Sequence, residues 1–153
     1  GSSMPVLPGE VMLATDMDYD SIAKAGSMLG SGAVIVMDDT RCMVKSLLRL
    51  SYFYYEESCG QCTPCREGMG WLHRIIDRIV AGQGRPEDID TMIRISNAND
   101  GTTICGMGDA AGFATVGIIA KYRDEFEYYI ANGQSKNGGR LEVGVMVQEA
   151  AHA

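Results

Sequence analysis

Hydrophobic residues recur at helical spacing over most of the chain. From residue 39 to residue 132 they return every three or four positions, which is typical of helices that bury one face. Candidate caps and glycine stops divide this region into four expected helices, at about residues 39–57, 63–81, 86–98 and 109–132. For the first of these, Asp39 or Thr40 is the expected cap. The pattern therefore predicts a mainly helical domain over residues 39–132.

The first 38 residues show a different pattern. The apolar residues within 10–15 predict a short strand, and the uninterrupted apolar run at 33–37 predicts a buried strand, with a short helix between them. Two strands are too few to close a core alone, so this α/β segment must pack on something else. Residues 133–153 lack a long periodic pattern and are expected to form an extended, partly mobile tail. The fold class expected overall is α+β.

Composition and charge exclude several classes of function. Hydrophobic residues make up 46% and charged residues 22% of the 153, as in an ordinary globular protein. The net charge is −7 and no segment is rich in Lys and Arg, so neither nucleic acid nor an anionic lipid surface is an expected partner. The longest apolar run is about five residues, too short to cross a bilayer. The first residues lack a secretory signal, and an intracellular chain is expected.

The cysteines carry the most specific chemistry in the sequence. Cys59, Cys62 and Cys65 form a Cys-x-x-Cys-x-x-Cys run, and Cys105 follows forty residues later. Two-residue spacers let one loop present three thiolates to an iron–sulfur cube, whose fourth iron needs a cysteine from a remote segment. A structural zinc site with four cysteines and a thiol–disulfide switch are the alternatives. Cys42 lies on the apolar side of the first expected helix and is left out of the site.

Residues beside the cysteines fit the cluster interpretation. Gly60 would let backbone N–H groups approach sulfide closely, and Pro64 would hold Cys65 in the first turn of the following helix, whose dipole favours an anionic group. Arg66 could offset the charge of a cluster. His73 has no second histidine nearby and is not expected to be a ligand.

These motifs resemble a known family, the NADH-binding flavoprotein subunit of respiratory complex I. The similarity lies in Glu57–Gly68 and Thr103–Ala111, and it extends to Gly1–Pro5, Ala25–Gly32, Val34–Asp38 and Tyr122–Glu127. The sequence departs from the family after Cys105, where Gly106-Met107 stands in place of the common Ala-Leu. The resemblance implies that residues 1–38 are the later part of a β-grasp domain, that residues 39–132 are a helical cluster domain, and that the chain is a C-terminal fragment.

The resemblance also implies a function. Cys59, Cys62, Cys65 and Cys105 would hold a [4Fe–4S] cluster that takes electrons from reduced FMN and passes them to the next cluster. FMN and NADH would bind in a preceding part of the full subunit. The implied partners are the other peripheral-arm subunits, especially a thioredoxin-like [2Fe–2S] subunit and a large multi-cluster subunit. The implied location is peripheral, on the cytoplasmic side of a bacterial inner membrane or the mitochondrial matrix side. The same module occurs in the diaphorase subunits of NAD-linked hydrogenases and formate dehydrogenases, which are the closest alternative.

Overall fold

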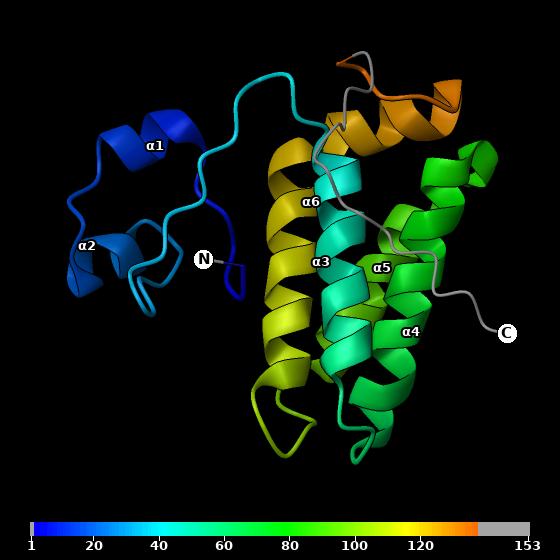
Figure 1. Cartoon of the computed structure of the whole chain (residues 1–153), viewed down its shortest axis with the longest axis horizontal. Helices are drawn as coiled ribbons and strands as arrows, with labels where there is room; N and C mark the ends of the chain where they lie inside the picture. Colours follow the sequence, from blue (N-terminus) through cyan, green and yellow to red (C-terminus); the bar gives the residue numbers. More distant parts are fainter. Residues whose placement is uncertain (1, 138–153) are drawn as a thin grey trace, which may run out of the picture.

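Four long helices pack side by side and form most of the structure (Figure 1), a computed structural model that describes residues 2–137. Their bounds are Met43–Glu57 for α3, Thr63–Arg78 for α4, Glu87–Asn99 for α5 and Met107–Asn132 for α6, with a short π-helical segment η1, Ile79–Gln83, after α4. Helix α3 packs against α4 and α6, and α5 packs against the same two helices. The mainly helical structure expected for this region is confirmed, and none of the helices in the described part of the chain is long and apolar enough to cross a membrane.

The core of the bundle consists of the apolar faces that the periodicity predicts. The larger apolar side chains that are fully buried are aliphatic, methionine and aromatic groups that come from all four helices and η1: Val44, Leu47, Met69, Leu72, Ile76, Ile79, Ile89, Met92, Ile118, Ile119 and Phe126. Burying such a side chain stabilises the fold by about 1.5–3 kcal/mol relative to leaving it exposed. The bundle is therefore held together mainly by hydrophobic packing.

Helix α3 begins later than the sequence predicts. Its N-cap is Cys42 rather than Asp39 or Thr40, and the Cys42 side chain makes no capping hydrogen bond. The backbone N–H of Met43, which has no partner within the helix, instead donates to the carboxylate of Glu125, with 3.0 Å between the nitrogen and Oε2. Since a carboxylate at a helix N-terminus is stabilised by the helix dipole, α6 supplies the cap that the local sequence lacks.

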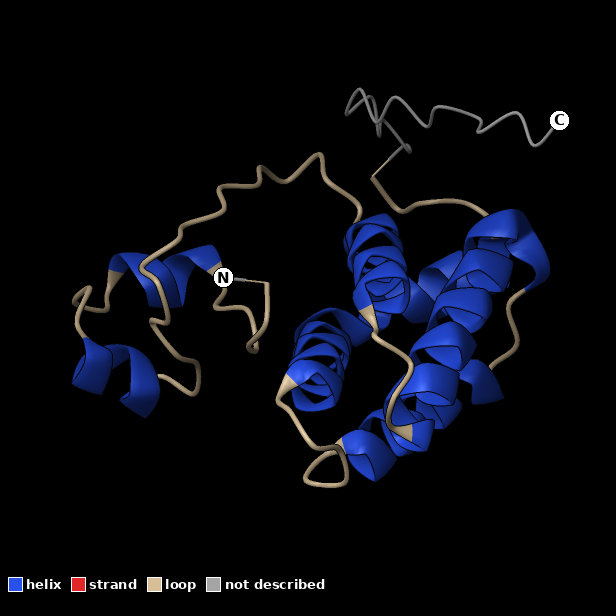
Figure 2. Cartoon of the chain, turned by 60° about the horizontal axis from the view of Figure 1, so that its bottom comes forward, coloured by secondary structure: helices blue, strands red, loops and turns tan. Residues whose placement is uncertain are grey.

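Both predicted strands are wrong. Residues 9–13 form the short helix α1, Gly9–Leu13, and the run 33–37 has no regular structure, although the short helix expected between them is present as α2, Tyr19–Lys24. A strand needs a neighbour for its backbone hydrogen bonds, and no strand occurs in residues 2–137 (Figure 2). The run is correspondingly exposed, with Val36 at 85%. The described residues thus show no part of a β-grasp sheet.

The amino-terminal segment nevertheless contacts the bundle. The hydroxyl of Tyr54 on α3 donates to the carbonyl of Ser2 at 3.1 Å, and its oxygen lies within hydrogen-bond distance, 2.9 Å, of Oγ of Ser3. Of the tail expected at 133–153, the structure describes residues 133–137, which contain no regular element, and the remainder lies outside the described residues.

Close approach of α4 and α5 requires the glycine at position 68. A Cβ atom there would lie 2.7 Å from Nδ2 and 2.8 Å from Oδ1 of Asn99, whose side chain is buried. We expect Gly68→Ala to lower the free energy of unfolding by about 1–3 kcal/mol, because overpacking forces one of the two helices to move. Urea denaturation followed by circular dichroism measures this loss.

Gly9→Ala is the matched control. Gly9 also stands in a helix, but a Cβ there would have nothing within 4 Å. We expect this variant to unfold within about 0.5 kcal/mol of the original chain. A Gly68→Ala chain as stable as Gly9→Ala would show that the two helices are not closely packed at this point.

Candidate metal centre

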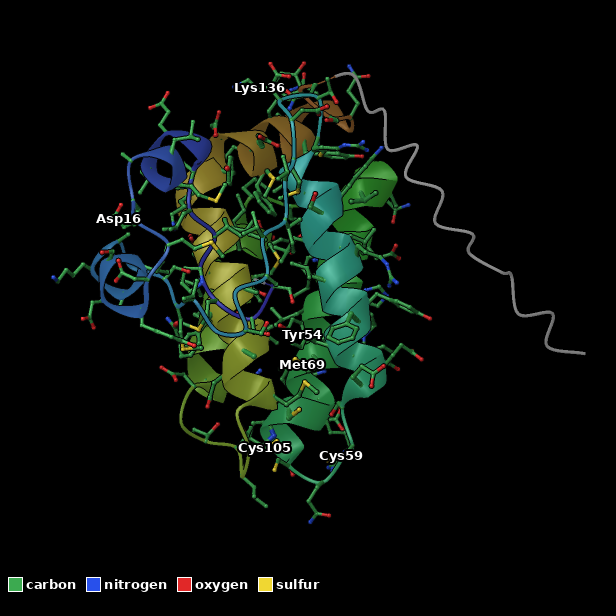
Figure 3. All side chains as sticks on the ribbon, turned by 60° about the vertical axis from the view of Figure 1, so that its left-hand side comes forward. Asp16, Tyr54, Cys59, Met69, Cys105 and Lys136 are labelled. Carbon is green, nitrogen blue, oxygen red and sulfur yellow. The ribbon has the colours of Figure 1, made fainter. Side chains whose placement is uncertain are left out.

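The four candidate ligands come from two loops and the first turn of α4, at one end of the bundle. The loop between α3 and α4 carries Cys59 and Cys62, and the loop between α5 and α6 carries Cys105 (Figure 1). Figure 3 shows Cys59 and Cys105 at the same end of the molecule, with Lys136 at the opposite end. Residues forty positions apart in the sequence are therefore neighbours in the fold.

One hydrogen bond joins the two loops directly. The backbone N–H of Ile104 donates to Sγ of Cys62, with 3.3 Å between the nitrogen and the sulfur. Cys62 is the N-cap of α4, and Cys65 is buried in the first turn of that helix, as the sequence predicts. The loop between α5 and α6 thus contacts the cysteine run through Ile104, the residue before Cys105.

The side chains do not close into a ligand set. Cys59 and Cys105 are exposed, Cys62 is half-buried, and the sulfur of each of the five cysteines is a free thiol. Within residues 2–137, no three His, Cys, Asp or Glu side chains are gathered so that they could hold a metal ion. The structure brings the two loops together and leaves the two outer thiols facing solvent.

The loop between Cys59 and Cys62 is held in place by Arg66. The guanidinium Nη1 donates to the carbonyl of Gly60 at 2.8 Å, and Nε donates to the Glu67 carboxylate at 3.1 Å. Gly60 has φ of 75°, in the left-handed region that favours glycine. Arg66 therefore places a positive charge beside the cysteines, and part of that charge is offset by Glu67.

Ser58 is a residue that the sequence interpretation missed. Its Oγ lies 3.2 Å from Sγ of Cys65 and accepts the backbone N–H of Gly60 at 3.4 Å. A serine that bonds the N–H two residues on is a common turn arrangement. The position of Ser58 immediately before the first cysteine is the signal that could have identified it.

The Cys105 loop has its own internal hydrogen bonds. Asp109, in the first turn of α6, accepts the backbone N–H of Gly101 at 2.9 Å, and Thr103 Oγ1 donates to the carbonyl of Cys105 at 2.8 Å. The first bond joins the start of the loop to α6, and the second lies within the loop. Cys105 is therefore presented by a folded loop whose start is bonded to α6.

An apolar cluster closes the side of the site that faces the bundle. Tyr54, Met69, Ala111 and Ala114 are buried together with Cys65, and Cys62 and Met107 pack against them. Figure 3 shows Tyr54 and Met69 on the bundle side of the two labelled cysteines. The thiols of Cys62 and Cys65, the two inner thiols, therefore lie against an apolar wall, where interactions between charges are stronger than in water.

Cys42 and His73 have other surroundings. Cys42 stands at the other end of α3, about 22 Å from the cysteine loop for a 15-residue helix. His73 lies between the rings of Tyr52 and Tyr55, with ring centroids 5.5 and 5.9 Å away, and its Nδ1 is 3.3 Å from the hydroxyl of Ser51.

The sequence that forms the bundle matches a known family. Residues 45–129, more than half of the chain, match the model of the NADH-ubiquinone oxidoreductase-F iron-sulfur binding region. The chain belongs to this family. The matched residues include Cys59, Cys62, Cys65 and Cys105, so the two loops described above lie within the iron–sulfur binding region.

Curated relatives in this family are subunits of NADH dehydrogenases. The chain is 46% identical over 127 residues to an NADH-quinone oxidoreductase subunit of Rickettsia bellii, covering 83% of this chain and 30% of that protein. It is 49% identical over 127 residues to NADH dehydrogenase [ubiquinone] flavoprotein 1 of Dictyostelium discoideum, covering 83% of this chain and 26% of that protein. The chain thus spans less than a third of the length of these relatives.

A solved structure of another oxidoreductase contains the same fold. A chain in the crystal structure of an NAD⁺-reducing [NiFe]-hydrogenase in the H₂-reduced state superposes with a TM-score of 0.75 and 28% identity. The match covers 85% of this chain and 22% of that chain. The fold of the iron–sulfur binding region is therefore shared between the two kinds of oxidoreductase.

The Arg66 contact predicts how firmly the cysteine loop is held. We expect Arg66→Ala to speed amide hydrogen exchange in residues 58–62, because the loop loses its bond to the Gly60 carbonyl. Arg123→Ala is the control, since Arg123 also pairs with carboxylates but lies on α6, away from the loop. Mass spectrometry of exchanged peptides measures both variants, and unchanged exchange in Arg66→Ala would contradict the assignment.

Burial of His73 predicts a pH dependence of stability. Burial lowers the pKa of His73 from its ordinary value of 6.5, outweighing the neighbouring carboxylates of Asp77 and Glu56, which raise it. The unfolded chain therefore binds more protons than the folded chain below about pH 6.5, and the free energy of unfolding falls as the pH is lowered through this region. We expect urea denaturation at pH 7.5 and pH 5.5 to show a smaller loss in His73→Gln than in the original chain. Equal losses would contradict the prediction.

Proposed function

We propose that Cys59, Cys62, Cys65 and Cys105 hold one [4Fe–4S] cluster. The observation that carries this proposal is the hydrogen bond from the Ile104 N–H to Cys62 Sγ, because it places the loop of the fourth cysteine on the Cys-x-x-Cys-x-x-Cys run. Hydrogen bonds to the sulfurs are among the features that set the potential of iron–sulfur sites. Membership of a family named for iron–sulfur binding supports the same assignment.

The donor set fits a cluster. Four thiols and no histidine stand at this end of the described chain, and thiolates are the ligands that iron–sulfur clusters take. Cys65 lies in the first turn of α4 and Cys62 is its N-cap, whereas Cys59 and Cys105 lie on loops and are exposed. To hold a cluster, the side chains of Cys59 and Cys105 would have to turn from solvent toward Cys62 and Cys65. A zinc ion could use the same four thiolates.

We further propose that the site relays electrons in an NADH:quinone oxidoreductase. A cluster held here would carry one electron at a time, whereas NADH delivers a hydride and therefore needs a flavin such as FMN as converter. The chain's own residues would supply position and environment. The first turn of α4 and Arg66 present positive charge to the site, and the apolar wall around Met69 excludes water from the inner side.

The acceptor of this relay would be a further iron–sulfur subunit of the same assembly. The names of the curated relatives describe them as subunits or flavoproteins of NADH dehydrogenases, which supports a place in a multi-subunit enzyme. The other peripheral-arm subunits, including a thioredoxin-like [2Fe–2S] subunit and a multi-cluster subunit, are the partners we propose. The location proposed for that assembly is peripheral to the energy-converting membrane, on its cytoplasmic or matrix side.

A diaphorase subunit of an NAD-linked hydrogenase is the second candidate. The superposition on the NAD⁺-reducing [NiFe]-hydrogenase favours it, because the fold is shared over 85% of this chain. The identity is 28% to that chain, against 46% and 49% to the two NADH dehydrogenase subunits. The higher identity makes the NADH dehydrogenase assignment the better supported of the two.

Metal analysis of anaerobically purified chain tests the cluster. We expect about four iron and four acid-labile sulfide per chain, and an S = 1/2 EPR signal after reduction by dithionite. Cys105→Ser should lose or alter this signal, because only three cysteine ligands would be left. Cys42→Ala should keep it, since Cys42 stands at the far end of α3.

Two results would overturn this proposal. About one zinc per chain without sulfide, from cells grown with iron, would indicate a structural Cys₄ zinc site in its place. An EPR spectrum and iron content unchanged in Cys105→Ser would show that another residue is the fourth ligand.

A further inference from the structure

Ser58 is placed to donate a hydrogen bond to one of the cluster ligands. Its Oγ lies 3.2 Å from Sγ of Cys65, and the contact is partly buried at the end of α3. A serine hydroxyl has one donor and two acceptor positions. The backbone N–H of Gly60 occupies one acceptor position at 3.4 Å, which leaves the hydroxyl hydrogen for the sulfur.

The protonation state of a ligating cysteine fixes the direction of this bond. A cysteine that binds a metal does so as a thiolate and has no S–H to donate. Ser58 must therefore be the donor whenever Cys65 is a ligand. A hydrogen bond to an ionised acceptor is shorter and stronger than one between neutral groups.

We propose that the Ser58 hydroxyl raises the reduction potential of the cluster by donating to the Cys65 thiolate. This inference rests on the proposed function. Reduction adds a negative charge to the cluster and its thiolates, and a donated hydrogen bond stabilises the more negative state more strongly. The bond lies next to the apolar wall of Tyr54 and Met69, where it is little screened by water.

The other inner ligand receives its hydrogen bond from the backbone. Cys62 accepts the N–H of Ile104, a donor that a side-chain substitution leaves in place. Cys65 is bonded by the side chain of Ser58, so a substitution at position 58 removes this hydrogen-bond donor without changing a cluster ligand. Ser58 is therefore a positioning residue that acts through Cys65, and its removal is the most direct test of hydrogen bonding at this site.

The test compares variants at position 58 by EPR-monitored reductive titration of the anaerobically prepared 153-residue chain. We expect a more negative midpoint potential in Ser58→Ala and Ser58→Val than in the original chain, and a potential close to the original in Ser58→Thr. Threonine and valine have similar volumes, so the pair separates the hydroxyl from packing. Ser46→Ala on α3 is the control, because Ser46 bonds the carbonyl of Cys42 at the other end of the helix.

Each outcome decides the inference. A negative shift in the alanine and valine variants alone supports it, as does loss of the cluster in these two variants with retention in Ser58→Thr. Unchanged potentials in Ser58→Ala and Ser58→Val overturn it, and so does a threonine variant that behaves as the valine variant does. A chain that holds no cluster before any substitution overturns the proposed function instead, so the two failures are distinguishable.

Discussion

The packing of α4 against α5 decides where the cysteines lie. Gly68 on α4 lets the side chain of Asn99 approach the helix backbone, and Asn99 is the last residue of α5. One turn before Gly68 stands Cys65, and directly after Asn99 the chain enters the loop that carries Cys105. A contact between two small or polar residues therefore fixes the distance between the segments that carry the four thiols. The hydrophobic core holds the helices, but this contact fixes their positions at the site.

Charges and hydrogen bonds determine the surroundings of the cysteine sulfurs at that end of the bundle. The net charge of the chain is −7, yet the cysteine run ends in the first turn of α4, where the helix dipole is positive. Arg66 follows the run directly, and its guanidinium donates to the carbonyl of Gly60 in the loop. Ser58 and the Ile104 N–H each reach one inner sulfur. Although the chain as a whole is negatively charged, hydrogen-bond donors, the N-terminus of α4 and Arg66 lie near these sulfurs. Such surroundings stabilise thiolates.

The sequence predicts the helices well, for physical reasons. A helix makes its backbone hydrogen bonds within itself, so the apolar periodicity and the local stops are enough to predict α4, α5 and the end of α3. A strand depends on partners elsewhere, and the apolar run ending at Met37 finds none in the described residues. The predicted start of α3 is wrong because its cap, Glu125, lies 82 positions away in sequence. The role of Ser58 likewise depends on a distance that spacing does not give.

The most direct test of the proposed centre is the position of iron in a crystal of the anaerobically loaded chain, located by anomalous scattering at the iron edge. We expect one compact iron peak bonded to the sulfurs of Cys59, Cys62, Cys65 and Cys105, at the end of the bundle where the two loops meet. An iron peak that excludes Cys105, or a peak seen at the zinc edge instead, would contradict this assignment.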